Sequence, residues 1–136
     1  GLLDGDSEPP LTAARRELVE EAGLEARTWH VLADFLNSPG GSSEAIRIYL
    51  ARDISVLPAG RPHTGEAEET ELPGVWIDLD VAAELVLAGE LNNPTTVVGV
   101  LAAVASRNTG WASLRPENAS WKARDSLHQI HRLPLR

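Results

Sequence analysis

The chain has 136 residues and a formal net charge of −8 at pH 7. That length suits one domain with its own core, and 43% hydrophobic with 24% charged residues is ordinary for a globular protein. It has no cysteine, which excludes disulfides and thiolate metal sites, and no apolar run of the ~20 residues that a membrane helix needs. The acidic balance argues against nucleic acid as a partner. We therefore expect a cytoplasmic domain with neither a membrane nor a nucleic-acid partner.

The charge is unevenly distributed along the chain. Residues 1–106 contain 6 Arg and 18 Asp+Glu, whereas residues 107–136 contain 6 Lys+Arg and 2 Asp+Glu. Apolar periodicity also fades beyond Arg107. The sequence therefore predicts a domain over 1–106 and a basic C-terminal tail over 107–136, which is either mobile or docked on the domain.

Periodicity and turn residues predict an alternation of helices and strands. The first helix should follow Thr12 as its N-cap and end at Gly23. The later elements are strands over 28–36, 45–51 and 75–79, loops over 37–43 and 57–72, and helices over 80–88 and 95–106. Asp80 is the expected cap of the first of these two helices. The second is expected to bury an apolar stripe made of Val97, Val98, Leu101, Ala102 and Ala105.

The first helix carries an acidic face. Glu17, Glu20 and Glu21 are spaced so that their carboxylates point the same general way on a helix, and Arg16 lies one turn before Glu20 and can pair with it. Carboxylate ligands of this kind suit a hard divalent cation such as Mg²⁺. A solvated acidic helix face is the alternative.

The spacing of these residues matches a known signature. Glu8, seven residues, and then Arg16-Glu17-Leu18-x-Glu20-Glu21-x-Gly23-Leu24 resembles the Nudix hydrolase pattern E-x7-R-E-U-x-E-E-x-G-U, where U is aliphatic. One position departs from it, because the pattern opens with a glycine where this chain has Leu2, and Gly1 comes one residue too early. An opening loop that is one residue longer, as in ADP-ribose-cleaving members, would reconcile the two.

The resemblance implies an α/β fold, the Nudix-type α/β/α sandwich with a mixed sheet. In that family the signature lies in mid-domain after several strands, so this chain is expected to be the C-terminal part of a longer protein. A homodimer is expected by the same resemblance.

By position in the signature, Glu17 and Glu21 should be the principal ligands of Mg²⁺, with Mn²⁺ as a substitute. Glu20 should be a further ligand or act through water. Arg16 should orient the glutamates and Glu8 should support the loop before the helix. For these last two residues, purely structural support is an open alternative.

Later residues resemble the ADP-ribose pyrophosphatase branch of the family. Pro39 is about fifteen residues after the signature, where that branch has a proline associated with ADP-ribose substrates, although Ser-Pro-Gly is also an ordinary turn. Gly40, Glu44 and Arg47 are the other candidates for substrate binding, with Arg47 alternatively an exposed strand residue.

The general base of that branch is usually a glutamate on a later loop that closes over the substrate. Glu68 is the matching position here, and Glu69 and Glu71 are rivals because the register of an acidic loop can shift. A solvated charge cluster is the alternative for this loop.

The resemblance thus implies Mg²⁺-dependent hydrolysis of ADP-ribose, or a related ADP-sugar, to AMP and a sugar phosphate. One alternative is a Nudix hydrolase of another nucleoside di- or triphosphate compound. Another is a Nudix-fold module that binds a nucleotide without turning it over.

Overall fold

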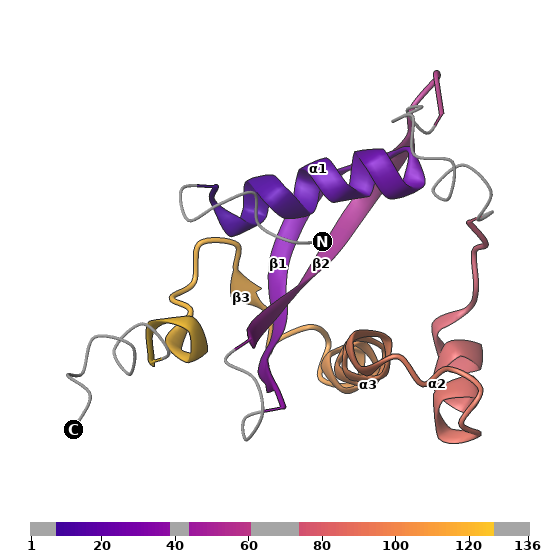
Figure 1. Cartoon of the computed structure of the whole chain (residues 1–136). Coiled ribbons are helices and arrows are strands. Elements are labelled where there is room, and N and C mark those ends of the chain that lie inside the picture. The colour runs from indigo at the N-terminus through magenta and orange to yellow at the C-terminus, as the bar shows by residue number, and fades with distance from the viewer. Residues whose placement is uncertain (1–7, 39–43, 61–73, 127–136) are drawn as a thin grey trace. The chain divides into compact units, whose positions relative to one another are not determined.

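The computed structural model describes residues 8–38, 44–60 and 74–126 (Figure 1). These residues belong to two compact units. The first takes its residues from 1–29 and 51–77, and the second from 30–50 and 78–136. Within the described ranges the named elements are, in chain order, α1 (Pro10–Ala22), β1 (Leu24–Asn37), β2 (Glu44–Val56), α2 (Leu79–Leu87), α3 (Pro94–Asn108) and β3 (Arg115–Pro116). A short helical segment over 122–126 follows β3. The predicted α/β class is confirmed.

Helix α1, in the first unit, begins and ends at residues that suit those positions. Pro10 occupies its first turn, where the missing N–H costs nothing, and Pro9 precedes it in an extended conformation. The predicted N-cap, Thr12, is wrong: it lies inside the helix, because the two prolines start the helix earlier. The predicted end is confirmed, since Gly23 adopts a left-handed φ of 65° and its N–H bonds the carbonyls of Leu18 and Val19.

The core of the first unit lies under α1. Ala13 and Trp29 are buried, and Trp29 Nε1 donates to the carbonyl of Ala26. The guanidinium carbon of Arg15 lies 5.9 Å from the centre of the Trp29 ring. This exposed side chain of α1 therefore also contacts β1. The N–H of Leu57, just after β2, donates to the carbonyl of Gly23 at 2.9 Å. The end of α1 is thereby fixed against the chain leaving β2.

The strands within the described ranges form a three-stranded sheet in which β1 lies between β2 and β3. Both long strands extend beyond the ranges predicted from sequence. Strand β3 pairs antiparallel with β1, with His30 opposite Pro116 and Val31 opposite Arg115. Val31 is fully buried, as expected at the centre of a sheet. The tail that the sequence left as mobile or docked therefore supplies a strand to this sheet.

Helices α2 and α3 lie side by side in the second unit (Figure 1). Asp78 caps α2 by accepting from the N–H of Asp80, so the predicted cap at Asp80 is two residues late. Asn93 caps α3 by accepting from the N–H of Thr96. The predicted buried stripe on α3 is partly wrong, because Leu101 is exposed and the buried positions are Ala103 and Ser106. Gly99 brings α3 close to Ile48, whose Cδ1 would lie 3.6 Å from a Cβ placed on the glycine.

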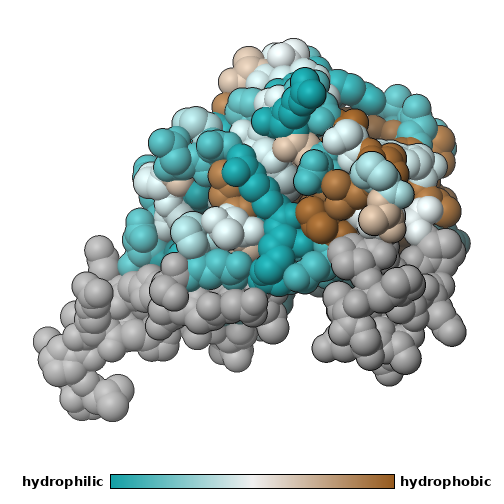
Figure 2. Space-filling view, turned by 90° about the horizontal axis from the view of Figure 1, so that it is seen from above, coloured by the Kyte–Doolittle hydropathy of each residue, from teal (hydrophilic) through white to brown (hydrophobic). Residues whose placement is uncertain are grey.

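The strand predicted over 75–79 is not formed. Residues 74–78 have no regular secondary structure, and Val75 and Trp76 are 82% and 77% exposed. The apolar pattern that predicted a strand is real, but these residues have no ladder partner within the described ranges. Figure 2 shows apolar surface interspersed with polar surface on the face that it draws. Among the helices described, none is long and apolar enough to cross a membrane.

Candidate functional site

Arg16 is the centre of a charge cluster on α1. Its Nε and Nη2 donate to Glu8 Oε1 and Oε2, both at 3.2 Å, which is the bidentate geometry of a guanidinium and a carboxylate. Its Nη1 lies 3.3 Å from Glu17 Oε1 and 3.2 Å from Glu20 Oε2. The pairing of Arg16 with Glu20 that the sequence predicted is therefore present. One guanidinium thus connects three carboxylates, from the residue before Pro9 to the fourth residue after Arg16.

The cluster remains partly accessible to solvent. The side chains of Arg16, Glu17 and Glu20 are 28%, 20% and 37% exposed, whereas Glu8 is 14% exposed. Glu21 is also exposed on α1. The three glutamates that contact Arg16 carry three negative charges against its one positive charge, so these four side chains together keep a negative excess that a cation would offset.

The donor atoms of this cluster suit a hard divalent cation, but they are not gathered as a complete ligand set. The contacted oxygens of Glu17 and Glu20 share one nitrogen of Arg16, so they are close neighbours. Within the described ranges, however, no group of three or more His, Cys, Asp or Glu side chains lies close enough to hold a metal ion. The signature glutamates therefore fit the metal in donor type and charge, while the described residues alone do not complete its coordination.

The other sequence-predicted site residues lie in different places. Glu44 is the exposed first residue of β2, and Asn37 Nδ2 donates to its Oε2 at 3.2 Å across the β1–β2 connection. Several candidates fall outside the described residues, namely Pro39, Gly40, Glu68, Glu69 and Glu71. Their assignment stays a prediction.

Arg47 is the centre of a second cluster, in the second unit. Its side chain is only 4% exposed, so it is not the exposed strand residue that the sequence allowed. Nε and Nη2 donate to the two carboxylate oxygens of Asp34 at 2.8 and 3.0 Å. Nη1 and Nη2 also donate to the backbone carbonyls of Ala119 and Ser120, at 2.7 and 2.9 Å. Arg47 therefore fastens the C-terminal segment to the two long strands.

Asp34 is shared between two arginines. Arg115 Nη1, on β3, lies 2.9 Å from Asp34 Oδ2. Burial raises the pKa of the Asp34 carboxyl, but hydrogen bonds and positive charge from Arg47 and Arg115 outweigh it, so the pKa lies below its ordinary value. Burial lowers the pKa of Arg47, and its contacts with Asp34 and Tyr49 more than reverse this effect. Burial raises the pKa of the Tyr49 hydroxyl, a shift that the nearby Arg47 opposes only in part.

Sequence reasoning missed this second cluster. Arg115 and Trp121 lie in the tail, and the Arg47 guanidinium carbon is 5.0 Å from the centre of the Trp121 ring. A signal was available in the strands, because Asp34 and Arg47 interrupt apolar stretches in two consecutive strands of a hairpin. The part played by the tail had no comparable signal, because β3 is only two residues long.

Comparison with known proteins places these features in a family. Residues 1–96 match the NUDIX domain. The chain is 42% identical over 132 residues to an ADP-ribose pyrophosphatase of Mycobacterium tuberculosis, covering 97% of this chain and 62% of the relative. It is 34% identical over 101 residues to an ADP-ribose pyrophosphatase of Bacillus subtilis, covering 74% and 52%.

A relative with a different substrate name matches the same region. The chain is 31% identical over 100 residues to a GDP-mannose pyrophosphatase of Escherichia coli, covering 72% of this chain and 49% of the relative. The chain thus spans about half to three fifths of the length of these relatives. With the signature complete from Glu8 to Leu24 and the match extending over residues 1–96, the chain belongs to the NUDIX domain family.

Proposed function

We propose that this chain carries the metal-binding part of an enzyme that hydrolyses the pyrophosphate bond of ADP-ribose, or of a related ADP-sugar. Water adds across the P–O–P linkage, so that one phosphate leaves on AMP and the other on the sugar. Two relatives at 42% and 34% identity are ADP-ribose pyrophosphatases. The observation that supports the proposal is the Arg16 cluster, in which one partly exposed guanidinium contacts the carboxylates of Glu17 and Glu20.

In this proposal Glu17, Glu20 and Glu21 hold the divalent cation, Mg²⁺ or Mn²⁺. When bound, the cation supplies positive charge that offsets the diphosphate and polarises its phosphoryl oxygens. Arg16 orients Glu17 and Glu20, and its two bonds to Glu8 stop the guanidinium from turning away. The role of Arg16 is therefore one of positioning.

The proton of the attacking water needs an acceptor. We assign that role to Glu68, with Glu69 and Glu71 as alternatives, on the resemblance alone. Pro39, Gly40 and Glu44 are proposed to contact the substrate on the same basis. Arg47 is proposed to support the strands and not to contact the substrate. It already donates four hydrogen bonds, to Asp34 and to the backbone carbonyls of Ala119 and Ser120.

The test is an assay of ADP-ribose hydrolysis by this chain, with Mg²⁺ and with a chelator. AMP and ribose 5-phosphate should form in equal amounts with Mg²⁺, and neither should form with the chelator. GDP-mannose is the second substrate to compare, because one relative is a GDP-mannose pyrophosphatase. If GMP is released from GDP-mannose faster than AMP is released from ADP-ribose, the proposed substrate would be a GDP-sugar and not an ADP-sugar. A triphosphate that yields pyrophosphate would point to the other class of Nudix substrate.

A binding module is the remaining alternative. It would bind ADP-ribose in a Mg²⁺-dependent way, measurable by calorimetry, with no product in the assay. The homodimer and the cytoplasmic location are proposed on the resemblance, and sedimentation of the purified chain tests the former.

A further inference from the structure

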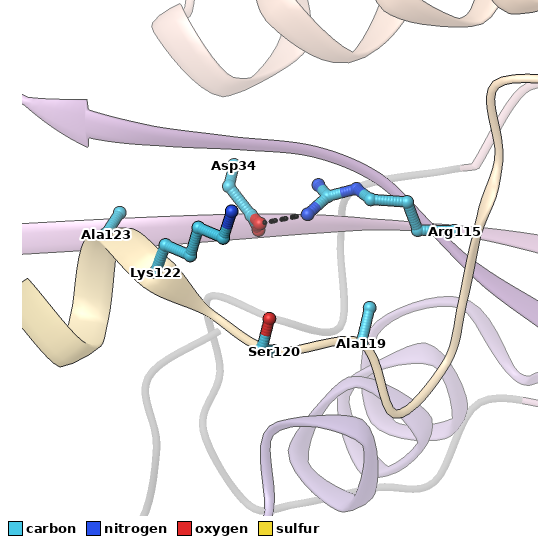
Figure 3. A pocket seen from close by; sticks show the side chains of 6 residues that line it. All are labelled: Asp34, Arg115, Ala119, Ser120, Lys122 and Ala123. Atoms are coloured by element: carbon cyan, nitrogen blue, oxygen red, sulfur yellow. Dashed lines mark ion pairs between the residues drawn. The ribbon is translucent and has the colours of Figure 1, made fainter.

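A cavity of about 530 Å³ lies beside the Asp34–Arg115 ion pair (Figure 3). Its walls come from β1, from β3 and from the segment that follows β3, and the lining residues are Asp34, Arg115, Ala119, Ser120, Lys122 and Ala123. All of them lie within the second unit. None belongs to the Nudix signature, and only Asp34 comes from the part of the chain that matches the family.

The charges of the residues that line this cavity do not balance. Asp34 is the one acidic residue of the lining, and Arg115 and Lys122 are both basic. Arg47, which is buried and is not part of the lining, already binds both carboxylate oxygens of Asp34. The negative charge of Asp34 is therefore offset without Arg115 and Lys122, which leave two surplus positive charges in a chain whose net charge is −8.

The polar groups of the lining converge. Figure 3 shows the ends of Arg115 and Lys122 directed toward Asp34 from opposite sides, with the Ser120 hydroxyl directed toward the same region. Contacts within the protein also hold this part of the lining in place without a ligand. Arg47 bonds the carbonyls of Ala119 and Ser120, and residues 122–126 form a short helical segment that begins with Lys122.

From this arrangement we propose that the cavity binds the phosphoryl group of a small phosphate monoester or of free phosphate. A phosphate carries a charge of about −2 near neutral pH, which matches the surplus of the lining. The guanidinium of Arg115 and the ammonium of Lys122 donate to phosphate oxygens, and the Ser120 hydroxyl adds a neutral donor. A carboxylate ligand would leave one positive charge unmatched. The volume lies within the range of small-molecule sites and exceeds what a phosphate alone occupies. This proposal does not depend on the proposed function.

The test uses an unusual feature of the sequence, since Lys122 is the only lysine in the chain. Reductive methylation with ¹³C-formaldehyde labels Lys122 and the α-amino group and keeps both positive charges. The two methyl signals are then followed by NMR while inorganic phosphate is added at constant ionic strength. We expect a saturable shift of the Lys122 signal, with the α-amino signal as the internal reference.

Two variants and one control make the test specific to the cavity. Arg115→Gln should weaken phosphate binding about tenfold, because it removes a charge-assisted donor. Ser120→Ala should weaken it a few-fold and leaves the Asp34–Arg115 pair untouched, which covers the case in which Arg115→Gln disturbs β3. Arg27→Gln removes an exposed positive charge on β1 outside the lining and should leave the affinity unchanged.

A shift that does not saturate, or one that sodium chloride reproduces, would overturn the proposal. The proposal would also be overturned if Arg115→Gln and Ser120→Ala bound phosphate as tightly as the chain without a substitution. The same titration with ribose 5-phosphate separates the two sources of the phosphoryl group. Tighter binding of the ester than of inorganic phosphate identifies a monoester ligand, and equal affinities identify the free phosphate ion.

Discussion

Arg16 and Arg47 each bind carboxylates, yet their surroundings give them opposite electrostatic character. Arg16 is 28% exposed and serves three glutamates, so its cluster keeps a negative excess. Arg47 is 4% exposed and shares a single aspartate with Arg115, so its cluster keeps a positive excess. The difference shows that an arginine–carboxylate pair has no fixed role. Exposure and the count of charges decide whether the cluster attracts a cation, attracts an anion or mainly stabilises the fold.

The largest effect that we expect is on stability, from Arg47→Met. The substitution leaves Asp34 buried with only the partly exposed Arg115, and it frees the carbonyls of Ala119 and Ser120. We expect the free energy of unfolding to fall by about 3 kcal/mol, measured by urea denaturation with tryptophan fluorescence. The exposed Arg27→Met is the matched control, expected within about 0.5 kcal/mol of the unmodified chain.

If Arg47→Met fails to fold, the double variant Asp34→Leu/Arg47→Met still decides the matter. Replacing both members of a buried pair with apolar residues removes the unpaired charge, so the double variant should be more stable than the single one. Equal instability of the two would show that Asp34 is not the reason for the loss.

The next effect is on catalysis, from Glu17→Gln. This change keeps the shape of the side chain but removes a negative charge from the Arg16 cluster. If the proposed function is right, turnover of ADP-ribose should fall on the order of 100-fold, and the Mg²⁺ concentration needed for half-maximal rate should rise. Glu25→Gln, an exposed glutamate on β1, is the control and should keep both values. Unchanged Mg²⁺ dependence in Glu17→Gln would contradict the metal assignment.

The two clusters also differ in how far the sequence predicted them. The Arg16 cluster lies within one helix and the residues just before it, so spacing alone indicated that Arg16 and Glu20 would meet. The Arg47 cluster depends on a pairing between strands and on a tail segment some seventy residues later in the chain. No local pattern encodes such contacts. Its hairpin component was accessible in principle, because Asp34 with Arg47 and Asn37 with Glu44 follow one antiparallel register.

The errors in predicting single strands, buried faces and caps also arise because contacts between distant parts of the chain cannot be predicted from a local pattern. Residues 75–77 are apolar enough for a strand, but strands need a partner, and the described residues supply none. On α3 the apolar periodicity pointed to Leu101, whereas the buried positions are Ala103 and Ser106. Gly99, one turn before Ala103, is the residue that lies close to Ile48. Capping was predicted within two residues at α2, because Asp78 and Asp80 are both good caps.

A smaller catalytic effect is expected for Arg16→Gln, which separates positioning from folding. The Arg16 pairs are partly exposed, so losing them should cost no more than about 1 kcal/mol of stability. Turnover should nevertheless fall about tenfold, because the glutamates lose the group that orients them. Arg27→Gln controls for the loss of one positive charge. A stability loss as large as that of Arg47→Met would show that the Arg16 cluster is mainly structural.

The smallest effect concerns acid pH and distinguishes Asp34 from ordinary surface carboxylates. Its pKa in the folded chain lies below the unfolded value of about 4, so its contribution to stability is complete above pH 4 and is lost as the pH falls through the lowered pKa. Urea denaturation of the unmodified chain between about pH 5 and pH 2 should therefore show a falling free energy of unfolding. Asp34→Asn should start lower and fall less steeply over the same range, because it has no proton to bind at that position. Parallel curves for the two proteins would mean that Arg47 and Arg115 do not favour the charged form of Asp34, and that the buried cluster is held together by its backbone contacts instead.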